Sequence, residues 1–243
     1  MYTEERCAHQ ESTPNPIPAD YPFDKVFLDL VGPLPPSQGF TYIIDFICAM
    51  TEWIEAFPLR SSDAEEAGHA LFNGVVLRHG CCRTLITDRG SNFTSVLLSE
   101  LCKLLQVRKV HTTAHHPEGN GVAERANGTI VRMLALFVNE NQNNWSELLP
   151  IILFSYHASY NRSIKMTPFE AMFGRRALMP LDLEHYTTPN SRNLEALTQV
   201  EVYMQKFETM QERTWTNNRK SQAKSKERCD ERRTDKSFQP ADS

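Results

Sequence analysis

The chain has 243 residues, an apolar fraction of 40% and a formal net charge of −4. It is long enough to bury a hydrophobic core, and its negative overall charge excludes nucleic-acid binding through bulk charge, so a DNA partner would need local basic patches. No apolar run approaches the length of a membrane span. The chain has six cysteines and no signal peptide before them, so we expect reduced, intracellular thiols.

The chain opens with a polar segment, residues 1–21, in which Pro14, Pro16 and Pro18 stand at alternate positions. Proline disfavours a helix, so we expect an extended linker here. Cys7 and His9 supply at most two of the four ligands that a structural zinc ion takes.

Three strands are predicted next, over residues 26–30, 42–48 and 53–59, because these runs are β-branched, aromatic and apolar. Short turn-rich connections between them indicate an antiparallel meander. Asp29 stands inside the first strand. Asp45 stands in the second, and we interpret it as a half-buried acid at a strand end without a catalytic role.

The next segment alternates between helices and strands. A helix is expected from residue 62 to a stop at Gly80, then a strand over 84–87 that delivers Asp88 to its C-terminal end. A helix over 95–105 and a short strand over 107–112 follow. The apolar face of that helix is predicted to comprise Leu97, Leu98, Leu101, Leu104 and Leu105.

A loop rich in His, Gly and Asn, residues 114–121, leads into a helix that begins near Gly121. Helical spacing places Glu124 and Asn127 on one face of this helix. The adjacent face is predicted to enter the core through Ala123, Ala126, Ile130, Leu134, Phe137 and Val138. A second long helix is expected over residues 145–160.

Residues 194–215 are predicted to be helical, and a basic run follows. It consists of Arg219, Lys220, Lys224, Lys226, Arg228, Arg232, Arg233 and Lys236. Both a solvated helix face and an arm that contacts phosphates fit this composition.

Three of the acids stand out, because Asp29 and Asp88 lie on predicted strands and Glu124 lies in the first turn of a helix. Thirty-five residues separate Asp88 from Glu124. Carboxylate oxygens are the ligands that Mg²⁺ prefers, and a pair of such ions can hold the attacking and leaving oxygens of a phosphodiester.

The sequence around these acids resembles retroviral-type integrases of gypsy-type LTR retrotransposons. Residues 28–35 (LDLVGPLP), 87–93 (TDRGSNF) and 116–128 (HPEGNGVAERANG) resemble the three motifs of that family in order, and residues 167–176 (TPFEAMFGRR) resemble the segment after its catalytic core. The resemblance extends from about residue 21 to residue 236. It maps the acidic triad of the family, with its thirty-five-residue gap, onto Asp29, Asp88 and Glu124.

The resemblance implies an α/β, RNase H-like fold, a mixed central sheet flanked by helices, with a C-terminal helical basic tail. The implied domains are a linker over 1–21, a catalytic core over 22–182, and a basic tail over 183–243 that stops before a C-terminal β domain. Whether the linker holds a remnant of an upstream zinc domain is left open by the resemblance.

The implied activity is 3′-end processing and strand transfer of DNA in the nucleus, by a nuclease and polynucleotidyl transferase that acts as a homo-oligomer on double-stranded DNA. The triad would hold two Mg²⁺ or Mn²⁺ ions. Contacts to DNA are expected from Asn92, His116, Asn120, Arg125 and Asn127, for each of which plain surface polarity stays an alternative. Two other functions remain open: an inactive or domesticated integrase that only binds nucleic acid or protein, and another nuclease or transposase of the same fold class.

Overall fold

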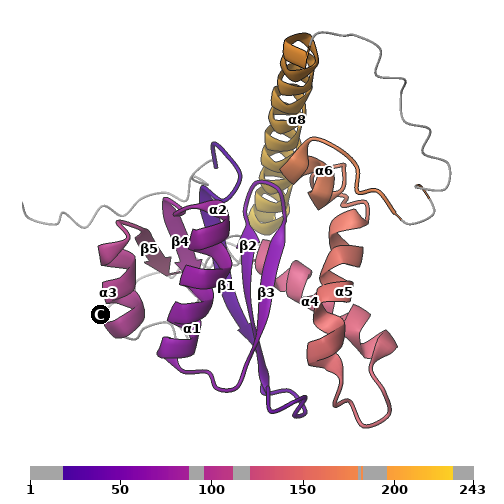
Figure 1. Ribbon diagram of the computed structural model, residues 1–243. Coiled ribbons are helices and arrows are strands. Elements are labelled where there is room, and N and C mark those ends of the chain that lie inside the picture. Colours follow the sequence, from indigo (N-terminus) through magenta and orange to yellow (C-terminus); the bar gives the residue numbers. More distant parts are fainter. Residues whose placement is uncertain (1–18, 88–95, 112–120, 180–181, 183–195, 232–243) are drawn as a thin grey trace, which may run out of the picture.

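A five-stranded sheet forms the centre of the molecule (Figure 1). The structure is a computed structural model that describes residues 19–87, 96–111, 121–179, 182 and 196–231. The strands are β1 (Lys25–Val31), β2 (Tyr42–Cys48), β3 (Ile54–Leu59), β4 (Thr84–Thr87) and β5 (Arg108–His111), in the spatial order β3-β2-β1-β4-β5. The first three strands pair antiparallel, whereas β4 and β5 run parallel to β1. The predicted meander and mixed sheet are confirmed.

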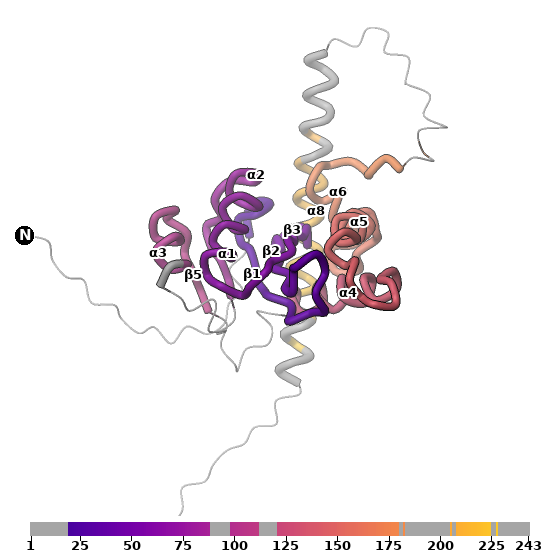
Figure 2. Tube along the Cα trace, turned by 60° about the horizontal axis from the view of Figure 1, so that its bottom comes forward, coloured from indigo at the N-terminus to yellow at the C-terminus, as the bar shows by residue number. Residues whose placement is uncertain are grey.

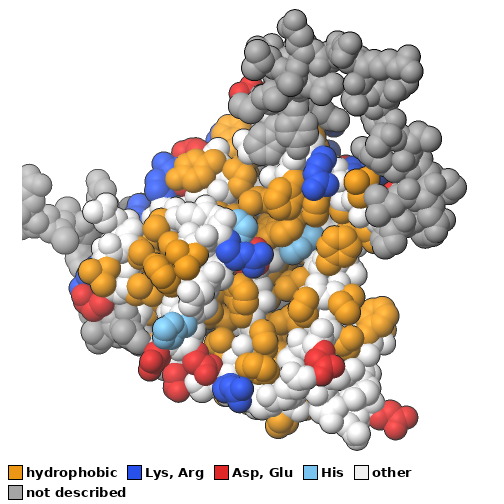
Figure 3. Space-filling model, in the orientation of Figure 1, with side chains coloured by type: hydrophobic (Ala, Val, Ile, Leu, Met, Phe, Trp, Pro, Cys, Tyr) orange, Lys and Arg blue, Asp and Glu red, His pale blue; other side chains and the backbone are white. Residues whose placement is uncertain are grey.

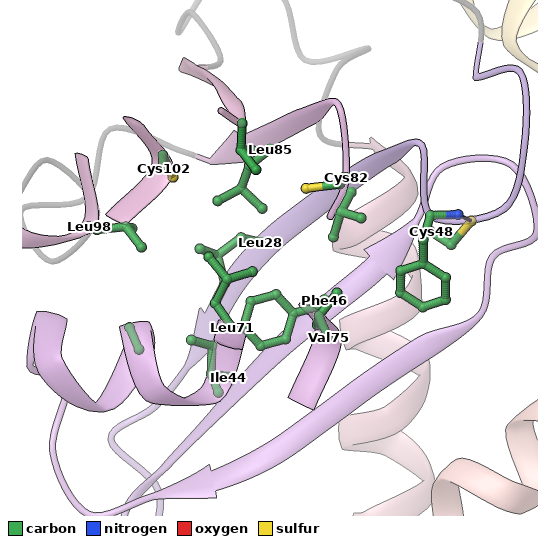
Figure 4. Packing of buried hydrophobic residues seen from close by; sticks show 14 of the residues in the cluster. Leu28, Ile44, Phe46, Cys48, Leu71, Val75, Cys82, Leu85, Leu98 and Cys102 are labelled. Atoms are coloured by element: carbon green, nitrogen blue, oxygen red, sulfur yellow. Dashed lines mark hydrogen bonds between the residues drawn. The ribbon is translucent and has the colours of Figure 1, made fainter. Parts of the chain in front are cut away.

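One face of the sheet is covered by the helices that precede and follow β4. The first is a continuous run of α1 (Ala64–Ala70), the π-helical segment η1 (Leu71–Val76) and α2 (Leu77–His79), and the second is α3 (Val96–Leu104). Gly80 ends the first run with a φ of +85°, as predicted. Leu28, Phe46, Leu71 and Leu98 meet in the core between these layers (Figure 4).

The apolar face predicted for α3 is only partly correct. Leu98 is fully buried, and Leu101 and Leu105 pack at the edge of the core, but Leu104 is 82% exposed. Cys102 is buried on α3 instead. The helix is short and covers the sheet near its edge, so its buried stripe is narrower than the leucine pattern implies.

The opposite face is covered by α4 (Gly121–Phe137) and α5 (Trp145–Ala158). The predicted core positions Ala123, Ala126, Ile130 and Leu134 of α4 are all buried. Phe137 is also predicted to enter the core, but it is 63% exposed. The reason is that Phe137 is the last residue of the helix, where the chain leaves the sheet.

The C-terminal part of the chain adds α6 (Pro168–Phe173) and the long helix α8 (Ala196–Glu231). A capping box between Thr167 and Glu170 begins α6. Figure 2 shows that the middle part of α8 passes alongside the sheet. Within the described segments, every helix is too short or too polar to cross a membrane.

Charge and apolar surface are distributed unevenly over the molecule. On the face shown in Figure 3, hydrophobic side chains gather between α1 and α5, around the edge strand β3, and the Lys and Arg side chains there are scattered.

Candidate active site

Asp29 lies in β1 with its side chain on the face covered by α4. Side chains alternate along a strand, so Phe27, Asp29 and Val31 point to one face and Leu28 and Leu30 to the other. The cores agree with this division, because Phe27 and Val31 pack with residues of α4 and α5. An acid at this position is therefore directed by strand geometry toward the helix that carries Glu124.

Asn127 joins α4 to β1 directly. Its Nδ2 donates a hydrogen bond of 2.8 Å to Oδ2 of Asp29, while the backbone N–H of Leu30 donates to Oδ1 of Asp29 at 2.9 Å. Asn127 is only 8% exposed. A hydrogen bond to an ionised acceptor is stronger than a neutral one, so this contact fixes the Asp29 carboxylate relative to α4.

Glu124 lies three residues before Asn127 on α4, in the first turn, and is exposed. Side chains three apart on a helix are neighbours, with Cβ atoms about 5–6 Å apart. The Asn127–Asp29 hydrogen bond therefore places Glu124 one helical turn from the point where α4 meets Asp29. Two of the three predicted acids are thus brought to one region of the molecule.

Asp88, Asn92, His116 and Asn120 lie outside the described residues. The structure does describe the strand before Asp88, because β4 ends at Thr87, and Thr87 pairs with Leu28 of β1. The end of β4 therefore lies next to the residue that precedes Asp29.

The structure corrects the predicted position and burial of Asp45. It lies in the middle of β2 rather than at its end, is 1% exposed, and stands directly opposite Asp29 in the antiparallel register. Burial, followed by the charge of Asp29, raises the pKa of Asp45 well above its ordinary value of 3.8. The signal was present in the sequence, because Ile43, Asp45 and Ile47 alternate along one strand face.

Arg125 is exposed on α4 and interacts electrostatically with Glu52, which is 6% exposed. Burial raises the pKa of Glu52, although the hydrogen bond from Asn161 and the charge of Arg125 oppose that shift. The first turns of α4 therefore present an arginine as well as a glutamate beside the sheet.

The chemistry of these donors suits a hard cation. Asp29 and Glu124 offer carboxylate oxygens, and Oδ1 of Asn127 is a buried acceptor that receives no hydrogen bond from the described residues. All of these are oxygen ligands of the kind that Mg²⁺ takes. Within the described residues alone, no three His, Cys, Asp or Glu side chains form a group that could hold a metal, and Asp88 lies outside that part of the chain.

Comparisons with known proteins relate this chain to integrases. Residues 19–117 match the family described as "Integrase core domain". The chain is 29% identical over 162 residues to the retrovirus-related Pol polyprotein from transposon 412 of Drosophila melanogaster, and 30% identical over 153 residues to the Pro-Pol polyprotein of simian foamy virus type 3 (strain LK3). These matches cover 66% and 63% of this chain but only 13% of each relative.

Solved structures show the same fold. The catalytic core domain of BIV integrase matches with a TM-score of 0.50 and 20% identity, over 67% of this chain and 96% of that domain. A chain of the simian T-cell lymphotropic virus intasome, solved in complex with a PP2A regulatory subunit, matches with a TM-score of 0.55 and 17% identity, over 72% of this chain and 59% of that one. The predicted RNase H-like architecture is confirmed.

Proposed function

We propose that this chain, whose residues 19–117 match the integrase core domain, catalyses metal-dependent 3′-end processing and strand transfer of the DNA of an LTR retroelement. The observation that carries the proposal is the hydrogen bond of Asn127 to Asp29. It joins β1 to the helix of Glu124, beside the end of β4.

In this proposal Asp29, Asp88 and Glu124 hold two Mg²⁺ or Mn²⁺ ions. When bound, such ions stabilise the negative charge that develops on the phosphodiester oxygens and help to ionise the attacking hydroxyl. Asn127 keeps the Asp29 carboxylate turned toward α4 by occupying Oδ2 with an N–H donor. Arg125 offers a positive charge next to Glu124 for a DNA phosphate.

The proposed partners are double-stranded DNA, both as element ends and as target, and further copies of this chain. Asn92, His116, Asn120 and Arg125 are proposed as DNA contacts. Asn127 is proposed as a DNA contact as well, although its amide nitrogen already donates a hydrogen bond to Asp29. The proposed location is the nucleus, where the target DNA is. We also propose that residues 22–182 form the catalytic unit and residues 183–243 a basic extension.

The test is a Mn²⁺-dependent reaction with a labelled DNA duplex that carries element-end sequences. We expect shortened strands and joined products from the wild type and neither from Asp88→Asn. Hydrolysis without joined products would indicate a nuclease of the same fold rather than an integrase. DNA binding with no products above the Asp88→Asn control would leave a binding protein.

A further inference from the structure

Helix α8 is fixed to the rim of the sheet by buried polar contacts. Asn218 is 6% exposed, and its Nδ2 donates to the backbone oxygens of Ala49 and Met50 at 2.6 and 2.9 Å. Thr214, one turn earlier, is fully buried and donates to Sδ of Met166. An amide that satisfies two carbonyls at the end of β2 sets both the position and the rotation of the helix.

This attachment brings α8 close to the start of β1. Lys25 borders the same small hollow as Asn218, Arg219 and Gln222 of α8. Lys25 and Asp29 are four residues apart on β1, so they share a face of the sheet and lie about 13 Å apart at a rise of about 3.3 Å per residue. The fixed part of α8 therefore lies beside the first residue of the strand that carries Asp29.

Three basic side chains of α8 lie next to this point. Arg219, Lys220 and Lys224 are all exposed. The guanidinium of Arg219 lies 4.5 Å from the centre of the Trp215 ring, which packs against the core. Stacking limits the freedom of this side chain without using its N–H donors, so they stay available to an anion.

The charge of this segment differs from that of the whole protein. Residues 219–236 contain eight basic and four acidic residues, whereas the whole chain has a formal net charge of −4. A local positive segment on a negative protein is the pattern expected of a defined anion-binding surface, because attraction falls off within a Debye length of about 8–10 Å.

From these observations we propose that α8 is a rigid contact for the DNA backbone, with Arg219, Lys220 and Lys224 extending the phosphate-binding surface beyond the catalytic acids. This inference rests on the proposed function. The partner is the sugar-phosphate backbone of duplex DNA and not an acidic protein, because the helix is held beside β1, the strand that carries Asp29. Rigidity strengthens binding, since a docked helix loses little conformational entropy when phosphates bind.

The test measures equilibrium binding of a fluorescent 20-base-pair duplex to the full chain. Binding is detected by fluorescence anisotropy, in EDTA and at several salt concentrations. The variant Arg219→Gln/Lys220→Gln/Lys224→Gln removes three exposed cations and leaves the buried contacts intact. We expect its affinity at 0.1 M salt to fall at least tenfold. The slope of log K against log salt should fall by up to about 2.7, because each lost phosphate contact removes about 0.9.

Two further variants separate the position of the charges from their number. Arg60→Gln/Lys103→Gln/Arg108→Gln removes the same charge from other exposed sites and should bind nearly as well as the wild type. Asn218→Leu keeps every charge but breaks the attachment to Ala49 and Met50, so it should weaken binding severalfold.

Equal losses for the two triple variants would overturn the inference, as would wild-type affinity of Asn218→Leu. Neither outcome affects the proposed function, which fails when the wild type with Mn²⁺ forms no joined products above the Asp88→Asn control. A wild type that binds no duplex at all would overturn both.

Discussion

Replacing Asn127 by alanine tests whether the contact between α4 and β1 serves the chemistry. The change removes the amide group whose Nδ2 donates a hydrogen bond of 2.8 Å to Oδ2 of Asp29. Asn127 is only 8% exposed. A hydrogen bond to a charged group contributes about 1.5–3 kcal/mol. Because about 1.4 kcal/mol corresponds to a factor of ten, loss of the donor should lower strand-transfer rates tenfold to about a hundredfold.

The assay compares joined DNA products over a range of Mn²⁺ concentrations. Asn127→Ala should need more Mn²⁺ for half-maximal activity, because a mobile Asp29 carboxylate binds an ion less well. Asn127→Asp should be worse, since it places a carboxylate against that of Asp29. Thr129→Ala, on the same helix without a contact to Asp29, serves as the control.

The melting temperature distinguishes positioning from plain stability. The reasoning would be refuted by an Asn127→Ala protein that melts at a lower temperature yet keeps both its rate and its Mn²⁺ midpoint within twofold of wild type. In that case the hydrogen bond would hold the two elements together and do nothing for the reaction.

Three other predictions concern stability. Mg²⁺ or Mn²⁺ should raise the melting temperature of the wild type but hardly that of Asp29→Asn/Asp88→Asn, since bound cations relieve carboxylate repulsion; equal shifts in calorimetry would count against a metal site. Asp45→Asn should stabilise the protein in EDTA, and more at pH 8 than at pH 5: the pKa of Asp45 is raised by folding, so the wild type loses stability as the pH rises above 3.8, whereas the amide does not titrate. We expect about 2–4 °C per kcal/mol, and a gain that does not change with pH would contradict this. Burial lowers the pKa of His157 from 6.5 to about 4, so its contribution is complete above pH 6.5 and is lost as the pH falls toward 4; this loss is roughly 3 kcal/mol. Urea denaturation should therefore show a shallower acid dependence for His157→Gln, which keeps an acceptor for the N–H of Ile54, and an unchanged slope would argue against it.

Local sequence determined the secondary structure and identified the candidate catalytic acids. Runs of β-branched, aromatic and apolar residues defined β1, β2 and β3, and the helical spacing of Ala123, Ala126 and Ile130 defined the buried side of α4. These patterns are readable because a buried strand needs apolar residues along its length, whereas a helix buried on one face needs them at a fixed period. The same patterns placed Asp29 in a strand and Glu124 at the start of a helix.

Tertiary structure decided which residues meet. The register that sets Asp45 opposite Asp29 depends on how β1 and β2 pair, and the contact of Asn218 with Ala49 spans 169 positions in the chain. Leu104 shows that periodicity alone does not ensure burial. Its position on α3 has the period of a buried helix face, but no described element covers it and it is 82% exposed. Periodicity reports that a residue has an apolar or polar side, whereas the partner on that side is set by packing between segments far apart in sequence.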